Sequence, residues 1–126
     1  MLLFSRSFFF MAFILSIACV SANGGQLPEK KEVPVDNMVT MVDLGAKSCI
    51  PCKMMAPVLK ELEEEYNGRA AIIFIDVWEQ KEKAGEFGIS SIPTQIFYNK
   101  SGQEVWRHSG FIDKKSISEK LDALLK

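Results

Sequence analysis

Metal-ligating residues are scarce in this chain, which holds one histidine, His108, and three cysteines among its 126 residues. A structural zinc site needs four ligands, so a zinc ribbon requires a second cysteine pair or two histidines. Cys49 and Cys52 supply a single pair, and His108 lies far along the chain on a predicted strand. We therefore expect no metal and no cofactor within one chain, and interpret His108 as an exposed strand residue. The alternative of a metal ion bound between two copies of the chain stays open.

The chain also lacks a surplus of either charge, with 15 lysines and arginines against 16 aspartates and glutamates. The net charge of -1 gives no electrostatic footprint for nucleic acid or an acidic membrane surface. About half of the residues are hydrophobic, as in ordinary globular proteins. A chain of this length has room for one hydrophobic core, so we expect a single domain that binds no nucleic acid.

No apolar run reaches the roughly 20 residues that a permanent membrane-spanning helix needs. The run FFFMAFILSIA over residues 8–18 follows Arg6, and small residues end at Ala22. This pattern predicts a secretory signal peptide over residues 1–22, hence a periplasmic or otherwise exported protein. The alternative, an uncleaved N-terminal segment that anchors the same domain outside the membrane, stays open. The stretch ending at Cys19 weakly resembles a bacterial lipobox, and a lipidated Cys19 would anchor the protein to the membrane.

Local patterns divide the remainder into a flexible lead-in over residues 23–36, rich in Gly, Pro and charge, and a folded domain over residues 37–126. Hydrophobic periodicity predicts the elements of the domain. In order, they are strand Met38–Leu44, helix Ile50–Tyr66, strand Ala70–Val77, helix Glu79–Phe87, strand Thr94–Tyr98, strand Glu104–His108 and a last helix capped by Asp113. A helical crossover makes the first two strands parallel, and a turn at residues 99–102 makes a closing hairpin. The order predicts an α/β fold with a mixed sheet.

The spacing of Cys49 and Cys52 allows more than one role. Cys49 lies at the predicted start of a helix, where free backbone N–H groups and the helix dipole stabilise a thiolate. Cys52 lies one turn on, within reach of a mixed disulfide on Cys49. Lys47 and Lys53 add positive charge nearby, which favours a redox pair. A structural disulfide also stays open, although so short a loop stabilises a fold little.

Two segments carry a family resemblance. The run VDLGAKSCIPCKMMAP resembles the active-site segment of the thioredoxin family, and Ser91-Ile92-Pro93-Thr94 resembles its cis-proline loop. The resemblance covers about residues 39–125. It implies the thioredoxin-like three-layer fold, a central mixed β-sheet flanked by helices, and thiol–disulfide oxidoreductase activity.

The resemblance also implies roles for single residues. Cys49 matches the attacking cysteine, Cys52 the resolving cysteine, and Asp43 a buried carboxylate that exchanges a proton with Cys52. The sequence supports the last role because Asp43 interrupts an apolar strand; an aspartate at an exposed strand end is the alternative. The matching substrate-binding residues are Ile92, Pro93 and Thr94 in the loop, with Ile50 and Pro51 between the cysteines.

Several residues depart from the family pattern. Ser48 stands where an aromatic residue usually precedes the first cysteine, and Gly45 replaces a second common aromatic residue. Ile50 takes the place of the usual glycine, and its bulk is expected to narrow the partner range. Phe74 stands where a lysine often accompanies the buried aspartate. These departures argue against a general thioredoxin and indicate a specialised member.

Pro51 beside the second cysteine matches reducing members of the family. We therefore expect a reductant or isomerase of protein disulfides that works through a mixed disulfide on Cys49. Its substrates would be protein thiols and disulfides. An exported reductant needs electrons from across the membrane, which implies a membrane thiol-electron transporter as donor. We expect a monomer. A non-catalytic binding or chaperone module with the same fold is the alternative.

Overall fold

The computed structural model describes residues 32–126. The predicted signal peptide, Cys19 and the first part of the lead-in lie outside the described residues. The elements are β1 (Val39–Gly45), α1 (Ile50–Glu65), β2 (Ala70–Asp76), α2 (Glu82–Glu86), β3 (Thr94–Tyr98), β4 (Glu104–Ser109) and α3 (Lys114–Leu125). Within residues 32–126, no helix is long and apolar enough to cross a membrane.

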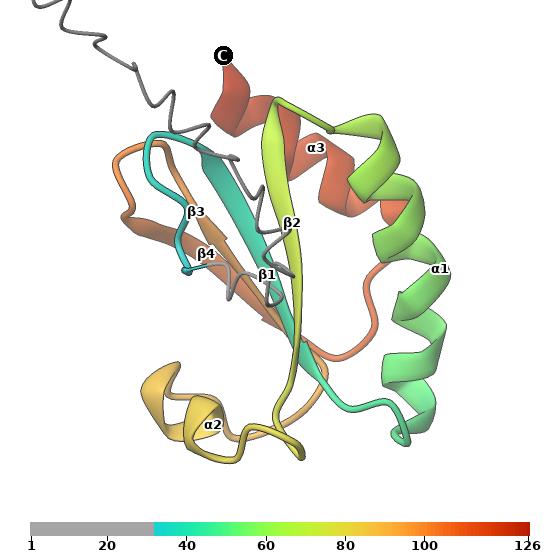
Figure 1. Ribbon diagram of the computed structural model, residues 1–126. Coiled ribbons are helices and arrows are strands. Elements are labelled where there is room, and N and C mark those ends of the chain that lie inside the picture. Colours follow the sequence, from blue (N-terminus) through green and yellow to red (C-terminus); the bar gives the residue numbers. More distant parts are fainter. Residues whose placement is uncertain (1–31) are drawn as a thin grey trace, which may run out of the picture.

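The four described strands form one mixed sheet in the order β2-β1-β3-β4. β1 and β2 run parallel because α1 carries the chain back between them, and β3 and β4 form the antiparallel hairpin. The turn of this hairpin has Gly102 at φ 76°, which favours glycine. Figure 1 shows α1 and α3 together on one side of the sheet, with α2 apart from them. These findings confirm the predicted α/β fold.

The sheet buries apolar side chains on both faces. Towards α1 and α3, the core includes Met41 of β1, Leu62 of α1 and Leu121 of α3, all with no exposed surface. On the opposite face, alternate residues such as Val42 and Ile96 form a second cluster. Because successive strand residues point to opposite faces, Asp43 points with Met41 towards the helices.

Two segments differ in detail from the sequence prediction. Val33 and Val35, which fall in the predicted lead-in, pack against the second cluster. The helix predicted over Glu79–Phe87 is shorter and begins at Glu82. Its expected first turn is absent because Asp76 accepts the backbone N–H groups of Trp78 and Glu79 and holds residues 77–80 in a turn.

Candidate active site

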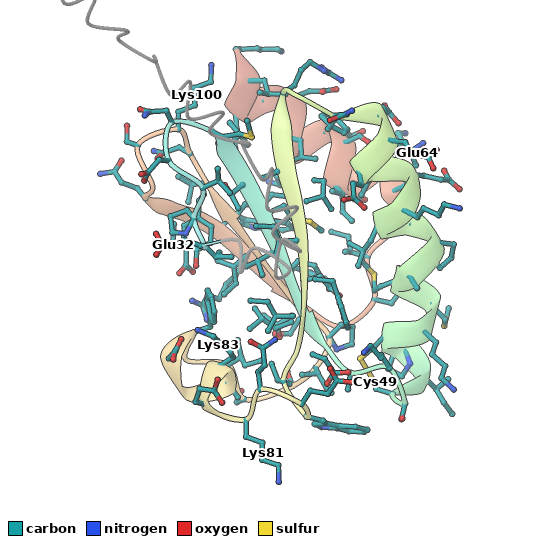
Figure 2. All side chains as sticks on the ribbon, viewed as in Figure 1. Glu32, Cys49, Glu64, Lys81, Lys83 and Lys100 are labelled. Atoms are coloured by element: carbon teal, nitrogen blue, oxygen red, sulfur yellow. A yellow bond between two sulfur atoms is a disulfide. The ribbon has the colours of Figure 1, made fainter. Side chains whose placement is uncertain are left out.

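The N-terminus of α1 positions the cysteine pair. Cys49 is the N-cap residue, with an extended backbone, and its Sγ accepts the N–H of Cys52 at 3.4 Å. Pro51 lies in the first turn, where a missing N–H removes no helical hydrogen bond. Cys49 stands where the chain leaves the sheet and enters α1 (Figure 2). The predicted helix-terminal position of the attacking cysteine is thus where the structure has it.

The two cysteines are joined in a disulfide, with their Cα atoms 5.2 Å apart. They differ in accessibility: Cys49 is partly exposed, whereas Cys52 is only 4% exposed. Cys49 is therefore the cysteine more open to an incoming thiol or disulfide. This asymmetry is the arrangement that a disulfide-exchange site needs.

The loop before β3 reaches the same end of the sheet. Ile92–Pro93 is a cis peptide bond, and the carbonyl oxygen of Pro93 accepts the N–H of Gly110 at 2.7 Å. Thr94 is buried and pairs with Leu44 of β1, so Pro93 lies one position further, beside Gly45. The predicted substrate-binding residues Ile92, Pro93 and Thr94 are therefore adjacent to the strand end that Cys52 contacts.

Gly45 is the residue of β1 that lies against the sulfur of Cys52. A β-carbon on Gly45 would lie 3.3 Å from Sγ of Cys52 and 3.1 Å from Cε2 of Phe74. Both distances are tighter than ordinary van der Waals contact. The Phe74 ring thus fills the space over Gly45, and two departures from the family pattern prove to be neighbours.

Asp43 is the buried acid of the site. It has no exposed surface, and its Oδ1 accepts the side-chain N–H of Gln95 at 2.7 Å. Burial raises the pKa of Asp43 from its ordinary value of 3.8 to about 6, and the hydrogen bond from Gln95 opposes part of that rise. The alternative of an exposed aspartate is wrong. Asp43 and Cys52 both flank Gly45, since Asp43 lies two positions back on the same face of β1.

A second aspartate organises the loop before the cysteines. Asp76 accepts backbone N–H groups from Lys47, Trp78 and Glu79, and the bond from Lys47 contributes most to holding the pKa of Asp76 below its ordinary range. Lys47 also pairs its Nζ with Glu79 at 2.8 Å. Because of this pairing, the positive charge that the sequence placed near Cys49 is partly neutralised at Lys47.

Exposed apolar side chains surround the cysteine pair. Ile50 between the cysteines is 76% exposed and Met54 on the next turn of α1 is 54% exposed. Pro51, the other predicted substrate-binding residue of this segment, is also exposed. Large apolar side chains left in solvent next to a reactive group are typical of a protein-docking surface.

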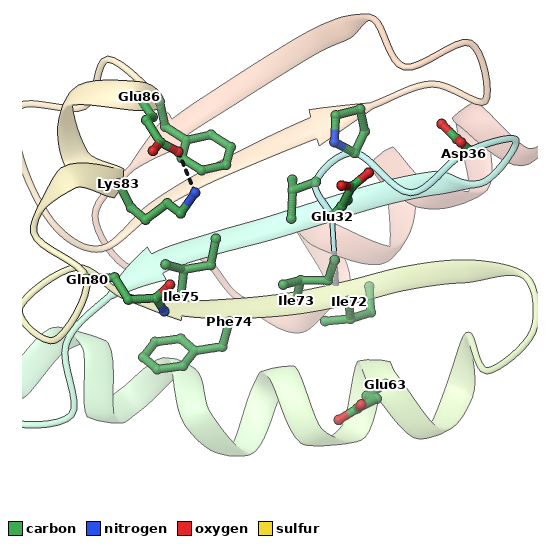
Figure 3. A pocket seen from close by; sticks show the side chains of 13 residues that line it. Glu32, Asp36, Glu63, Ile72, Ile73, Phe74, Ile75, Gln80, Lys83 and Glu86 are labelled. Carbon is green, nitrogen blue, oxygen red and sulfur yellow. Dashed lines mark hydrogen bonds and ion pairs between the residues drawn. The ribbon is translucent and has the colours of Figure 1, made fainter. Parts of the chain in front are cut away.

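Two hollows flank the edge strand β2. One of about 360 Å³ lies between α1 and β2 and includes Cys52 and Phe74 in its lining. Another, of about 910 Å³, is lined by Ile73 and Ile75 of β2 and by α2, where Lys83 pairs with Glu86 (Figure 3). Neither cysteine lines the larger hollow.

The accessible Cys49, the shielded Cys52 and the adjacent Ile92–Pro93 loop, at the end of a mixed sheet, define a thiol–disulfide oxidoreductase of the thioredoxin type. The sequence pattern of the family described as Thioredoxin matches residues 29–123. Thioredoxins of Staphylococcus aureus strains Mu50 and MW2 are each 44% identical to the chain over 88 residues. These matches cover 70% of this chain and 84% of each relative. The chain belongs to the thioredoxin family, and its substrates are protein thiols.

Sequence reasoning missed Gln95 and Asp76 as members of the site. Each is a buried polar residue in a largely apolar strand, which is the same signal that identified Asp43. The sequence alone indicates no role for Gln95, because only the register of β3 against β1 places it opposite Asp43. Asp76 marks the end of β2, but its bonds to three backbone N–H groups are a property of the folded loop.

Proposed function

We propose that this protein is an exported reductant or isomerase of protein disulfides that works through a mixed disulfide on Cys49, which Cys52 resolves. The difference in accessibility between the two sulfurs carries this proposal. Cys49 is partly open to a substrate disulfide, whereas Cys52 is only 4% exposed and is held one helical turn away, bonded to the sulfur of Cys49.

In the reducing direction, the Cys49 thiolate attacks a substrate disulfide and forms a mixed disulfide, releasing one substrate thiolate. Cys52 then attacks Cys49, the bond from Cys49 to the substrate breaks, and the second substrate sulfur leaves as a thiolate. Two electrons pass to the substrate while the Cys49–Cys52 disulfide forms. Asp43 is proposed to accept the proton of the Cys52 thiol, since a buried carboxyl group with a pKa of about 6 exchanges protons near neutral pH.

The substrate groove is proposed to run along the Ile92–Pro93–Thr94 loop and the exposed Ile50 and Pro51. The loop lies beside Gly45, which contacts Cys52, so an extended substrate segment on it would bring its sulfur to Cys49. The bulk of Ile50, fully outside the core, supports a restricted set of partners.

Export is proposed from the pattern of residues 1–22, with the mature protein in the periplasm or an equivalent space. A lipidated Cys19 would keep it at the membrane. A membrane thiol-electron transporter is the proposed donor, and a monomer the proposed state. N-terminal analysis of the mature protein separates the routes: a start at Asn23 supports simple cleavage, and a lipid-modified Cys19 supports the anchored form.

Trapping tests the catalytic proposal. Cys52→Ser leaves the attacking sulfur without its resolving partner, so it should accumulate mixed disulfides with client proteins. The matched variant Cys49→Ser should accumulate none. Equal trapping by the two variants would contradict the assigned roles, and absence of trapping together with no disulfide reduction by the wild-type protein would favour a non-catalytic binding module.

A further inference from the structure

Asp43 and Gln95 face each other across two neighbouring strands. They are directly opposite in the antiparallel register of β1 and β3, and neither has any exposed surface. One hydrogen bond, from Nε2 of Gln95 to Oδ1 of Asp43 at 2.7 Å, joins the two side chains. A buried amide and a buried carboxyl group therefore form an isolated polar pair in the core.

The same pair contains two buried polar atoms left without a hydrogen bond. Oδ2 of Asp43 and Oε1 of Gln95 have no partner among residues 32–126. Both are acceptors while Asp43 is ionised, so neither can satisfy the other. A buried acceptor without a donor is costly, and two in one pair need an explanation. A single proton on Oδ2 supplies the donor that both atoms lack.

We propose that Gln95 is a positioning residue for thiol exchange, whose amide holds a proton on Asp43 by pairing with the carboxylic acid through two hydrogen bonds. In the acid form, Nε2 donates to Oδ1 as it does here, and the Oδ2 hydroxyl donates to Oε1. In the ionised form only the first bond remains. The inference rests on the proposed function, in which Asp43 takes up the proton of Cys52.

The proton moves in the resolving step. The Cys52 thiol gives its proton to Oδ2 of Asp43, and the resulting thiolate attacks the sulfur of Cys49. The disulfide between Cys49 and the substrate breaks, the Cys49–Cys52 disulfide forms, and the substrate sulfur leaves with the electron pair and is protonated by solvent. Asp43 thereby changes from carboxylate to acid, which is the form that the Gln95 amide satisfies completely.

Apart from Gln95, the elements packed around Asp43 bring few polar side chains that could interact with its carboxyl group. Across β2, the residue paired with Asp43 is Phe74, which has no polar atom in its side chain. From α3, the side chains buried in the core are apolar. The titratable groups that the strands and the start of α1 bring to this face are Cys52 on α1, Asp76 on β2 and His108 on β4. The charged residues that line the hollow beside Cys52 and Phe74 are Lys47, Lys53, Lys60 and Glu63. Asp76 is occupied by three backbone N–H groups, and His108 contacts the carbonyl oxygen of Phe111.

Burial brings the pKa of Asp43 to about 6, and no charged side chain among residues 32–126 contributes to that shift. The bond from Nε2 of Gln95 to Oδ1 by itself lowers this pKa, because it also stabilises the carboxylate. The second bond, from the Oδ2 hydroxyl to Oε1, exists only in the acid form and therefore acts in the opposite direction. A lysine on β2 would favour only the carboxylate. An amide can hydrogen-bond to both the carboxylate and the carboxylic acid, because it carries a donor and an acceptor. Asp43 thus has Phe74 beside it on β2, where the family often has a lysine, and Gln95 beside it on β3. This arrangement suits a carboxylic acid that keeps its proton close to neutral pH.

The wild-type protein provides the first test, which needs no substitution. Carbon-detected NMR can follow the Asp43 carboxyl and the Gln95 side-chain carbonyl from pH 4 to pH 8 (about the range that brackets the titration). We expect both carbons to titrate with one midpoint, because protonation of Oδ2 places a donor on Oε1. A Gln95 carbonyl that does not move while the Asp43 carboxyl titrates would overturn the proposal.

Substitution gives the second test. Gln95→Met keeps length and volume but removes the donor and the acceptor. We expect the resolving step, measured on a preformed mixed disulfide, to slow by about tenfold and its pH midpoint to move, while the KM for substrate changes less than about twofold. In an Asp43→Asn background the same substitution should cause no further slowing. Equal slowing in both backgrounds, or an unmoved pH profile, would show a structural role only.

The exposed Gln103 offers a matched control, since Gln103→Met makes the same chemical change outside the core. This control should leave rate and pH midpoint unchanged. Failure of the proposed function would be recognised separately, as wild-type protein that resolves no mixed disulfide at any pH. If Gln95→Met does not fold, the titration of the wild-type protein decides alone.

Discussion

The ring of Phe74 occupies the space over Gly45, where a β-carbon would meet Cε2 of the ring at 3.1 Å. Gly45 stands where the family often has an aromatic residue, and Phe74 where it often has a lysine. The two departures therefore act together. Phe74 of β2 supplies the aromatic surface beside Cys52. Because Phe74 occupies the position where the family often has a lysine, Asp43 has no lysine as its neighbour on β2.

This relationship predicts coupling between positions 45 and 74. Gly45→Ala should destabilise the oxidised protein by about 1 kcal/mol, because a methyl group crowds both the ring and the Cys52 sulfur. In a Phe74→Leu background the cost should be smaller, as the ring contact is gone. Denaturant unfolding of the four proteins measures the coupling. Gly85→Ala is the control, since a β-carbon there meets nothing within 4 Å. Equal costs in both backgrounds would refute the coupling.

Asp43 predicts a characteristic dependence of stability on pH. Its folded pKa of about 6 lies above the ordinary 3.8, so the folded state binds more protons between these values, and stability falls as pH rises through that window. Ionisation of this one group should cost on the order of 3 kcal/mol above pH 6. Asp43→Asn removes the ionisation, so it should be more stable than wild type at pH 7 and lose the fall between pH 4 and pH 6.

Thermal unfolding across pH 3 to 8 (about the span needed) checks this prediction. Asp36→Asn, at an exposed aspartate, is the control and should leave the profile unchanged. An Asp43→Asn protein less stable than wild type at pH 7, or with an unaltered fall between pH 4 and pH 6, would contradict the burial cost assigned to Asp43.

The hydrogen bonds of Asp76 predict a stability that changes with pH in the opposite direction to that of Asp43. Its bonds from the N–H groups of Lys47, Trp78 and Glu79 lower its folded pKa, so its contribution to stability is present above the ordinary 3.8 and is lost as pH falls through the folded value. Asp76→Asn keeps one oxygen and loses the bond to Lys47. We expect a lower Tm at pH 7 and a difference from wild type that shrinks in acid. Glu79→Gln isolates the exposed Lys47–Glu79 ion pair and should change Tm little.

Ile50 predicts an effect on selectivity without one on stability. Its side chain is 76% exposed, so Ile50→Ala should change the free energy of unfolding by less than about 0.5 kcal/mol. If its bulk restricts partners, the ratio of kcat/KM for a large protein disulfide to that for a small one should rise by about threefold or more. Val105→Ala, an exposed position on β4, serves as the control. An unchanged ratio would remove Ile50 from the groove.

The sequence predicted the fold closely because the strands and long helices carry strong hydrophobic periodicity. β3 was predicted with its observed ends, and α1 to within one residue of its observed end. The start of α2 was wrong because the bonds that Asp76 makes to the next backbone N–H groups depend on the folded loop.

The site was predictable where a local pattern carries the chemistry, as with Cys49 and Cys52. It was not predictable where strand register decides the neighbour. Asp43 could be recognised as a buried acid, but its partner Gln95 is far away in sequence and meets it only through the pairing of β1 with β3. The contact of Gly45 with Phe74 is likewise a product of packing between β1 and β2.

The reduction potential of the Cys49–Cys52 pair tests the central claim most directly. Equilibration of the purified protein with defined dithiol and disulfide buffers, followed by counting of free thiols, gives this potential. As a reductant or isomerase, the protein should have a value near or below about -250 mV. A value near roughly -120 mV would mean that the pair donates its disulfide, and the proposed direction of catalysis would then be wrong.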